Sequence, residues 1–337
     1  MKLNFVFAGL KALFCLKIQR KNYPLALRWQ LLDRCGNRCR YCALWKNPRP
    51  EMELTEIKEI LRQAGKAGTA RISFSGGEPL LRDDIGEIIK YAKGLNISCS
   101  MNTRGALIEK RKDALQNLDM IKISIDGSEP THDYISGRKG AFEQSYNALR
   151  ICVEMGIKTV ITTTITKYNL NDIDFIAGLA EKFGVLAAFQ PFKLMYKGSK
   201  DSELCPDEKR YKEAVDKLIK LKKEGFPFLR NSLSSLRHIR NYPCFPGVKC
   251  AAGKLFAVID VDGTLLPCDR NDGEFFGELP NVREGFLKAF RKLPEYSCSG
   301  CGFLGARELS YFMGMNFEGM ESVKNILSAE KRAKNEP

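Results

Sequence analysis

Strand-like and helix-like segments alternate along the chain from about Leu25 to Phe192. Short runs rich in β-branched and apolar residues are separated by amphipathic segments, the pattern of parallel βα units. Six strands are expected, at 25–32, 71–75, 97–101, 120–125, 159–165 and 186–192. Helices are expected between them, at 55–67, 82–93, 109–118, 141–155 and 172–184. Six units are too few for a closed eight-stranded barrel, so the pattern predicts an open or partial barrel or a doubly wound sheet.

The pattern changes after the sixth strand. Helices are expected at 206–224 and 231–240, followed by a hairpin around Val-Asp-Gly at 261–263 and a short helix at 287–293. The region beyond 240 is rich in loops and cysteines, as in a small unit held together by a metal. The expected divisions of the 337 residues are an N-terminal amphipathic segment at 1–24, a barrel at 25–240, a cysteine-rich unit at 241–310 and a helix and tail at 311–337.

Cysteine is unusually frequent, with 12 Cys beside 2 His. A small secreted disulfide scaffold would be much shorter, and no clear signal-peptide cleavage site follows the apolar N-terminus. No apolar run reaches the ~18 residues of a membrane-spanning helix. A reducing, cytoplasmic location is therefore expected, in which clustered cysteines bind metal or act in catalysis. Cys99 and Cys152 stand alone in apolar segments and are expected to be core residues.

Three cysteines follow the first strand within eight residues, at Cys35, Cys39 and Cys42. Parallel α/β folds build their sites at this edge, where the strands end. A structural zinc ion takes four ligands, and no fourth Cys or His lies nearby. Three thiolates suit a [4Fe–4S] cluster with one iron left open for a substrate or cofactor.

The Cys-x3-Cys-x2-Cys spacing, with Tyr41 before the third cysteine, resembles the signature of the radical S-adenosylmethionine (SAM) superfamily. The resemblance implies a partial (β/α)6 TIM-like barrel. It also implies that the three thiolates hold a [4Fe–4S] cluster and that SAM chelates its open iron. The reduced cluster then cleaves SAM to a 5′-deoxyadenosyl radical, which abstracts a substrate hydrogen. Tyr41 would lie near the adenine; packing of a loop aromatic on the barrel is the alternative.

Further motifs at the strand ends extend this resemblance. Gly76, Gly77, Glu78 and Pro79 match the family's GGEP motif, which holds the amino group of SAM. Asn102 would line the SAM pocket, and Ser124 would face the ribose. Arg138 would contact the SAM carboxylate, for which a guanidinium is the physical match, with an exposed surface charge as the alternative. For His132, a structural role is favoured over a catalytic one.

The later cysteines resemble the SPASM/Twitch auxiliary domain, in its shorter one-cluster form. The implied ligands of one auxiliary iron–sulfur cluster, expected to be [4Fe–4S], are Cys250, Cys268, Cys298 and Cys301. Cys244 is an alternative ligand, and a four-thiolate zinc site is an alternative use of the group. Asp269 follows Cys268 and is a candidate general base by similarity to the anaerobic sulfatase-maturating enzymes; an exposed hairpin residue is the alternative.

The formal net charge is +14, spread along the chain rather than gathered in one run. A flavodoxin or ferredoxin reductant would suit such a surface, whereas no nucleic-acid-binding motif is present. Residues 3–18 are rich in Leu and Phe, and either pack across the barrel or lie on an anionic membrane through residues 1–20. The predicted function is hydrogen abstraction from a peptide, cofactor precursor or other metabolite. A membrane-associated enzyme acting on lipid and a non-catalytic zinc or iron–sulfur scaffold are the alternatives.

Overall fold

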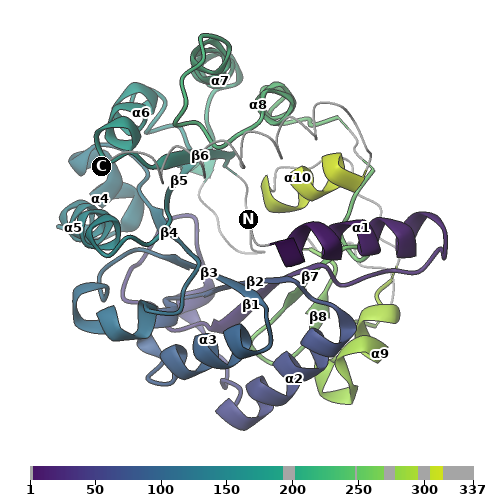
Figure 1. Cartoon of the computed structure of the whole chain (residues 1–337). Coiled ribbons are helices and arrows are strands. Elements are labelled where there is room, and N and C mark those ends of the chain that lie inside the picture. The colour runs from purple at the N-terminus through teal and green to yellow at the C-terminus, as the bar shows by residue number, and fades with distance from the viewer. Residues whose placement is uncertain (1–2, 193–201, 247–248, 269–277, 295–303, 314–337) are drawn as a thin grey trace.

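A curved eight-stranded sheet forms the centre of the protein (Figure 1), in the order β6-β5-β4-β3-β2-β1-β7-β8. The computed structural model describes residues 3–192, 202–246, 249–268, 278–294 and 304–313. All neighbouring strands run parallel except β8, which is antiparallel to β7. The strands are β1 (Ala26–Leu32), β2 (Arg71–Gly76), β3 (Ser98–Thr103), β4 (Met120–Ser124), β5 (Thr159–Ile165), β6 (Leu186–Pro191), β7 (Phe256–Ile259) and β8 (Leu265–Leu266). Since β6 and β8 are the two edges, the barrel is open, as the sequence predicted.

The α-helices of the described residues are α1 (Leu3–Lys17), α2 (Leu54–Ala67), α3 (Ile85–Gly94), α4 (Glu129–Ser136), α5 (Ala141–Glu154), α6 (Ile173–Lys182), α7 (Glu208–Lys223), α8 (Leu233–Ile239), α9 (Phe286–Arg291) and α10 (Leu304–Met313). Most of them cover the outer side of the sheet, whereas α10 packs against its inner face beside β7 and β8, and α1 lies beside α10 (Figure 1). In α2 the local sequence sets both ends, because Glu53 and Glu56 form a capping box and Gly68 ends the helix at a φ of 97°. Its buried residues recur at helical spacing and face the sheet: Ile57, Ile60, Leu61 and Ala64.

The two faces of the sheet differ in polarity. On the outer face, apolar residues such as Trp29, Phe74 and Ile123 pack under the helices in the main core. The inner face alternates with them and carries polar and charged residues. Its members include Arg28, Ser73, Ser100, Asn102, Lys122, Ser124, Thr162, Thr164 and Gln190. Beside β7 and β8 the same face is apolar, since Ala26, Phe256, Val258 and Leu266 pack with Leu309 of the C-terminal helix. The inside of the barrel is therefore polar over its middle strands and apolar at this end.

The six predicted strands of the barrel are confirmed to within a few residues at each end. Two helical segments differ from expectation. The helix expected at 109–118 is a 3₁₀ segment, η3 (Glu109–Leu115), interrupted at Arg111, and α4 was not predicted. The predicted hairpin is present, and its first strand joins the barrel sheet beside β1, so this part of the cysteine-rich region continues the same sheet.

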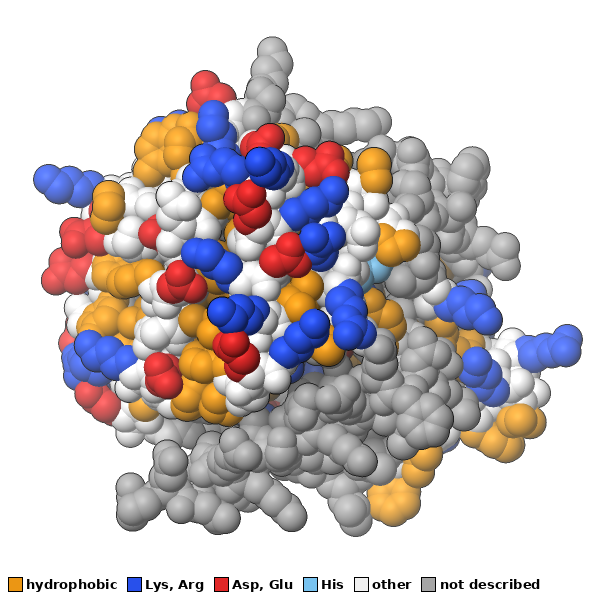
Figure 2. Space-filling view, turned by 90° about the horizontal axis from the view of Figure 1, so that it is seen from above, with side chains coloured by type: hydrophobic (Ala, Val, Ile, Leu, Met, Phe, Trp, Pro, Cys, Tyr) orange, Lys and Arg blue, Asp and Glu red, His pale blue; other side chains and the backbone are white. Residues whose placement is uncertain are grey.

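On one side of the molecule, positive and negative side chains are mixed rather than gathered in a single basic patch (Figure 2). Figure 2 looks onto the side of the molecule that carries α7, where Lys and Arg side chains alternate with Asp and Glu. Ion pairs such as Lys217–Asp174 and Lys212–Glu208 account for part of this mixture. No helix among the described residues is long and apolar enough to cross a membrane.

Candidate functional site

The loop that carries Cys35, Cys39 and Cys42 follows β1 directly and is held by backbone hydrogen bonds on two sides. On one side, the N–H of Gly77 donates to the carbonyl of Leu32, at 2.7 Å. On the other, the N–H groups of Arg38 and Arg40 donate to carbonyls at the end of α4, at 3.2 and 3.0 Å. The loop therefore has a fixed backbone path between the ends of β2 and α4.

Gly76 and Gly77 make this arrangement possible. A Cβ atom on Gly76 would lie 2.2 Å from the carbonyl oxygen of Leu32, and one on Gly77 would lie 2.0 Å from that of Arg34. Gly76 also has a φ of 120°, which other residues rarely adopt. The two glycines thus allow β2 to approach the chain just before Cys35, a role independent of any ligand.

Burial shapes the chemistry of the three thiols. Desolvation raises the pKa of Cys35, Cys39 and Cys42, in the case of Cys39 to about 12. The Arg104 guanidinium acts in the opposite direction on the pKa of each of the three. Arg104 is therefore a buried cation placed to favour thiolates in this loop.

Arg104 belongs to a buried polar network with Tyr41 and Asp126. The Tyr41 hydroxyl donates to Asp126 Oδ2 at 3.0 Å and accepts a hydrogen bond from Arg104, which also pairs with Asp126 Oδ2 at 3.0 Å. The other guanidinium nitrogen donates to Ser136 at the end of α4, at 2.8 Å. This network ties Tyr41, in the cysteine loop, to the ends of β3 and β4.

His132 and Glu78 are buried and fully engaged inside the protein. His132 Nδ1 accepts the N–H of Asp126 at 2.9 Å, and desolvation lowers its pKa to about 4, so the ring is neutral. The Glu78 carboxylate accepts from the hydroxyl of Thr103 and the N–H of Arg104, at 2.8 and 3.1 Å. Both side chains therefore support the site, and any contact of Glu78 with a ligand rests on its backbone.

The other predicted SAM-binding residues lie at the same edge of the sheet. Asn102 and Ser124 face the inside of the barrel near the ends of β3 and β4, and Ser124 Oγ is 3.4 Å from Thr162 Oγ1. Pro79 begins the turn after β2. The Arg138 guanidinium lies close to Gly36 in the cysteine loop, 3.6 Å from where a Cβ would be. The predicted residues of the first motif group thus lie at one edge of the sheet, and Gly76, Gly77 and Arg138 lie beside the cysteine loop.

The donor set of the first cysteine group is three thiols on one loop. Cys35, Cys39 and Cys42 are all free thiols. In a cubane cluster each thiolate binds a different iron, so spaced sulfurs on one loop are compatible with it.

The second cysteine group is only partly within the described residues. Cys268, buried, follows β8, and Cys250 precedes β7, where its sulfur accepts the N–H of Ala252 at 3.4 Å. Cys244 is exposed. Cys298, Cys301 and Asp269 lie outside the described residues. The isolated Cys99 and Cys152 are buried in the main core, as predicted.

A salt-bridge cluster connects the two cysteine-bearing regions. Arg49 binds Asp33, at the end of β1, and Asp260, at the end of β7, with nitrogen–oxygen distances of 2.8 and 2.7 Å. These hydrogen-bonded carboxylates raise the pKa of Arg49. The cluster fixes the chain after β1 and the start of the β7–β8 hairpin in one position.

Sequence reasoning did not assign roles to Arg104, Asp126 and Arg49. For Arg104 and Asp126 a signal was present, because Asp126 directly follows the predicted strand 120–125 and Arg104 comes three residues after the predicted strand 97–101, at the edge where such folds build sites. For Arg49 no local signal existed, since its partners lie 16 and 211 positions away.

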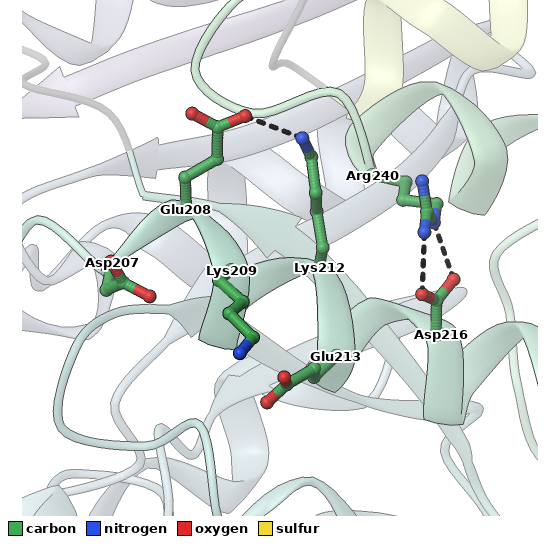
Figure 3. A pocket seen from close by; sticks show the side chains of 7 residues that line it. All are labelled: Asp207, Glu208, Lys209, Lys212, Glu213, Asp216 and Arg240. Carbon is green, nitrogen blue, oxygen red and sulfur yellow. Dashed lines mark hydrogen bonds and ion pairs between the residues drawn. The ribbon is translucent and has the colours of Figure 1, made fainter.

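A depression on the outer surface, along α7, is lined only by charged residues (Figure 3): Asp207, Glu208, Lys209, Lys212, Glu213, Asp216 and Arg240. Two ion pairs cross it, between Lys212 and Glu208 and between Arg240 and Asp216. Because its charges largely compensate one another in contact with solvent, it does not resemble a ligand site.

Comparison with known proteins agrees with this geometry. Residues 29–180 match the Radical SAM superfamily. The Fe-coproporphyrin III synthase of Methanosarcina barkeri is 32% identical over 225 residues, which are 63% of this chain and 56% of that protein. The AdoMet-dependent heme synthase of the same organism is 26% identical over 325 residues, covering 85% and 89% of the two chains. The chain spans about half the length of the first curated relatives it matches, from 46% to 56%.

The solved structures show the fold. SuiB of Streptococcus suis, bound to S-adenosylmethionine, superposes with a TM-score of 0.65 at 18% identity, over 84% of this chain and 69% of SuiB. Residues 29–180 therefore resemble the Radical SAM superfamily in sequence, and the solved structures show that the chain has the same open-barrel fold.

Proposed function

We propose that this chain reductively cleaves SAM and uses the resulting 5′-deoxyadenosyl radical to abstract hydrogen from a substrate inside the barrel. A [4Fe–4S] cluster, when bound, supplies the electron for this cleavage. The observation that carries the proposal is the backbone-fixed loop of free thiols Cys35, Cys39 and Cys42 at the carboxyl ends of the strands.

The residues around the loop would hold SAM and exclude water. Gly76 and Gly77 bring backbone groups close to the loop, where they would bind the amino group of SAM. The Arg138 guanidinium, beside Gly36, would bind its carboxylate as a two-pronged donor. Asn102 and Ser124 would contact the ribose and the wall of the pocket, and Tyr41, held by Arg104, would lie near the adenine.

For the substrate, we propose a tetrapyrrole that carries carboxylates. The inner face of the barrel presents the cations Arg28 and Lys122, which are hydrogen-bonded to Ser75 and Ser73 at 2.7 and 3.2 Å. Carboxylates are the groups such a face would bind. The names of the two Methanosarcina barkeri relatives, at 26% and 32% identity, point to the same class.

We further propose that Cys250, Cys268, Cys298 and Cys301 hold one auxiliary iron–sulfur cluster, with Cys244 as an alternative ligand. The placement of Cys250 and Cys268 at the β7–β8 hairpin, fixed to β1 through Arg49, would set that cluster at a constant distance from the first. Asp269 beside it is a candidate base. A flavodoxin or ferredoxin would dock on the basic surface and supply electrons to the proposed clusters.

The test is anaerobic reconstitution of the full chain with iron and sulfide. We expect a reduced-cluster EPR signal that changes when SAM is added, together with formation of 5′-deoxyadenosine. Cys39→Ala should abolish both, whereas Cys15→Ala, a thiol on α1 far from the loop, should leave both intact. A protein that binds zinc instead, or that forms no 5′-deoxyadenosine, would be the non-catalytic scaffold.

The substrate is tested with the same enzyme. Iron-coproporphyrin III and heme would be titrated while the Soret band is followed, and SAM turnover measured with each and with a peptide library. Lys122→Gln should weaken tetrapyrrole binding without changing the EPR response to SAM, since Lys122 does not act on the pKa of any of the three cysteines. Stimulation of turnover by a peptide alone would reject the tetrapyrrole and keep the radical SAM chemistry.

A further inference from the structure

The N-terminal helix α1 has one face packed and one face open. Its inner side chains Ala8, Ala12, Cys15 and Leu16 belong to a small core with residues of α10 and of the segments before β1 and β7. Figure 1 shows α1 lying beside α10. The helix is therefore docked on the barrel, as one of the two expectations from sequence had it. That contact uses only about half of its circumference.

The opposite side of α1 exposes large apolar side chains, and Ile18, which follows the helix directly and donates its N–H to the carbonyl of Phe14, continues this side. Phe7, Leu10, Phe14 and Ile18 have exposed fractions of 62%, 59%, 52% and 69%. At 100° per residue, these four positions fall within an arc of about 80° and so form one stripe. The described part of the chain exposes six large hydrophobic side chains, and these four are among them. Such a concentration on one helix marks a contact surface.

Cations border this apolar stripe. At the same 100° per residue, Lys11 falls at one margin and Lys17 at the other, while Arg20 and Lys21 follow the end of the helix. All four are exposed, and within the described residues none takes part in an ion pair. No Asp or Glu occurs before Asp33. An apolar stripe with unpaired cations on both margins complements a surface that is apolar below and anionic above.

We propose that α1 docks this protein on the surface of an anionic lipid bilayer. Phe7, Leu10, Phe14 and Ile18 insert at the boundary between headgroups and acyl chains, and the flanking cations contact anionic headgroups. The helix has 15 residues and rests on the barrel through its other face, so it lies in the plane of the interface. This proposal does not depend on the chemistry proposed above.

The test is flotation of the purified full chain with vesicles made of equal parts phosphatidylcholine and phosphatidylglycerol. We expect the wild type to float with these vesicles and to stay behind with phosphatidylcholine alone. Replacing the stripe by Phe7→Ser, Leu10→Ser and Phe14→Ser should reduce the bound fraction at least about tenfold. Phe175→Ser, at an exposed apolar side chain on α6, is the matched control and should float like the wild type.

Three outcomes would overturn the proposal. Absence of flotation with anionic vesicles would do so directly, as would equal binding to both kinds of vesicle, since the cations would then have no part. A dimer in light scattering that the triple variant dissociates, without flotation, would identify a second copy of the chain as the occupant. Because the three side chains are exposed, the variant should keep its circular dichroism and melting temperature, which are measured alongside.

Discussion

Removal of the Arg49 side chain measures how much the salt bridges between the ends of β1 and β7 contribute to the stability of the protein. Arg49 forms hydrogen bonds of 2.7 to 3.2 Å with both oxygens of Asp33 and of Asp260. The side chains of Asp33 and Asp260 are only 1% and 12% exposed, whereas that of Arg49 is 37% exposed. In Arg49→Ala two nearly buried carboxylates would lose their shared cation.

Breaking a buried pair from one side costs about 3–5 kcal/mol. Here each carboxylate keeps one backbone donor, from Arg49 itself and from Val261, and solvent reaches the guanidinium. We therefore expect the free energy of unfolding to fall by about 3 kcal/mol, the lower end of that range. Urea denaturation at neutral pH, followed by circular dichroism, measures it.

Two further variants test whether the stability lost in Arg49→Ala comes from leaving buried carboxylates without a cation. Arg240→Ala removes an equally bidentate pair with Asp216, but at an exposed site, and should cost no more than about 1 kcal/mol. Combining Arg49→Met with Asp33→Asn and Asp260→Asn removes the charges together and should recover most of the stability. The reasoning is refuted if Arg49→Ala costs no more than Arg240→Ala, or if the triple variant is no more stable than Arg49→Ala.

Two other predictions concern the cysteine loop and its support. Gly77→Ala places a Cβ against the Arg34 carbonyl and should sharply lower the amount of iron bound after reconstitution. The control is Gly178→Ala, whose new Cβ has no atom within 4 Å and which should bind as much iron as the wild type. Equal iron contents in the two variants would contradict this reasoning. The folded-state pKa of His132 is about 4 against an ordinary 6.5, so the unfolded chain binds the proton first. Burial of the neutral His132 ring therefore contributes about 3 kcal/mol to the pH dependence of the free energy of unfolding. This contribution is complete above pH ~6.5 and is lost as the pH falls to ~4. His132→Asn, which keeps an acceptor for the Asp126 N–H, should flatten the stability profile in that window, and an unchanged slope in urea titrations would show that another group titrates.

The fold was predictable where the sequence pattern and the packing agree. Strand residues such as Trp29, Phe74 and Ile123 alternate with polar ones, so the barrel strands could be placed almost to the residue. Helix α4 has few buried apolar residues of its own, and its position depends on distant partners, as when Ser128 binds Asp172. At 109–115, Arg111 leaves helical geometry and donates hydrogen bonds to Arg82 and Asp83. Such tertiary contacts leave no periodic signal in the sequence.

For the site, spacing located the three cysteines and the glycine pair, because both motifs are local. The residues that hold them are not local: Arg104 reaches Tyr41 across 63 positions, and Arg49 reaches Asp260 across 211. Their partners could be found only after the strands were in place. The sequence therefore predicted which residues gather at the edge of the barrel, and the structure showed what fixes them there.

The backbone bonds of the cysteine loop have a consequence for the order of assembly. The loop is anchored to Gly77, directly after the next strand, and to Ile135 and Ser136, nearly a hundred residues further along the chain. A nascent chain lacks the second anchor until α4 has been synthesised and folded. The three thiols therefore acquire their spacing late in folding. The proposed cluster would be assembled on a barrel that is already largely built, and its iron would have to enter at the carboxyl ends of the strands.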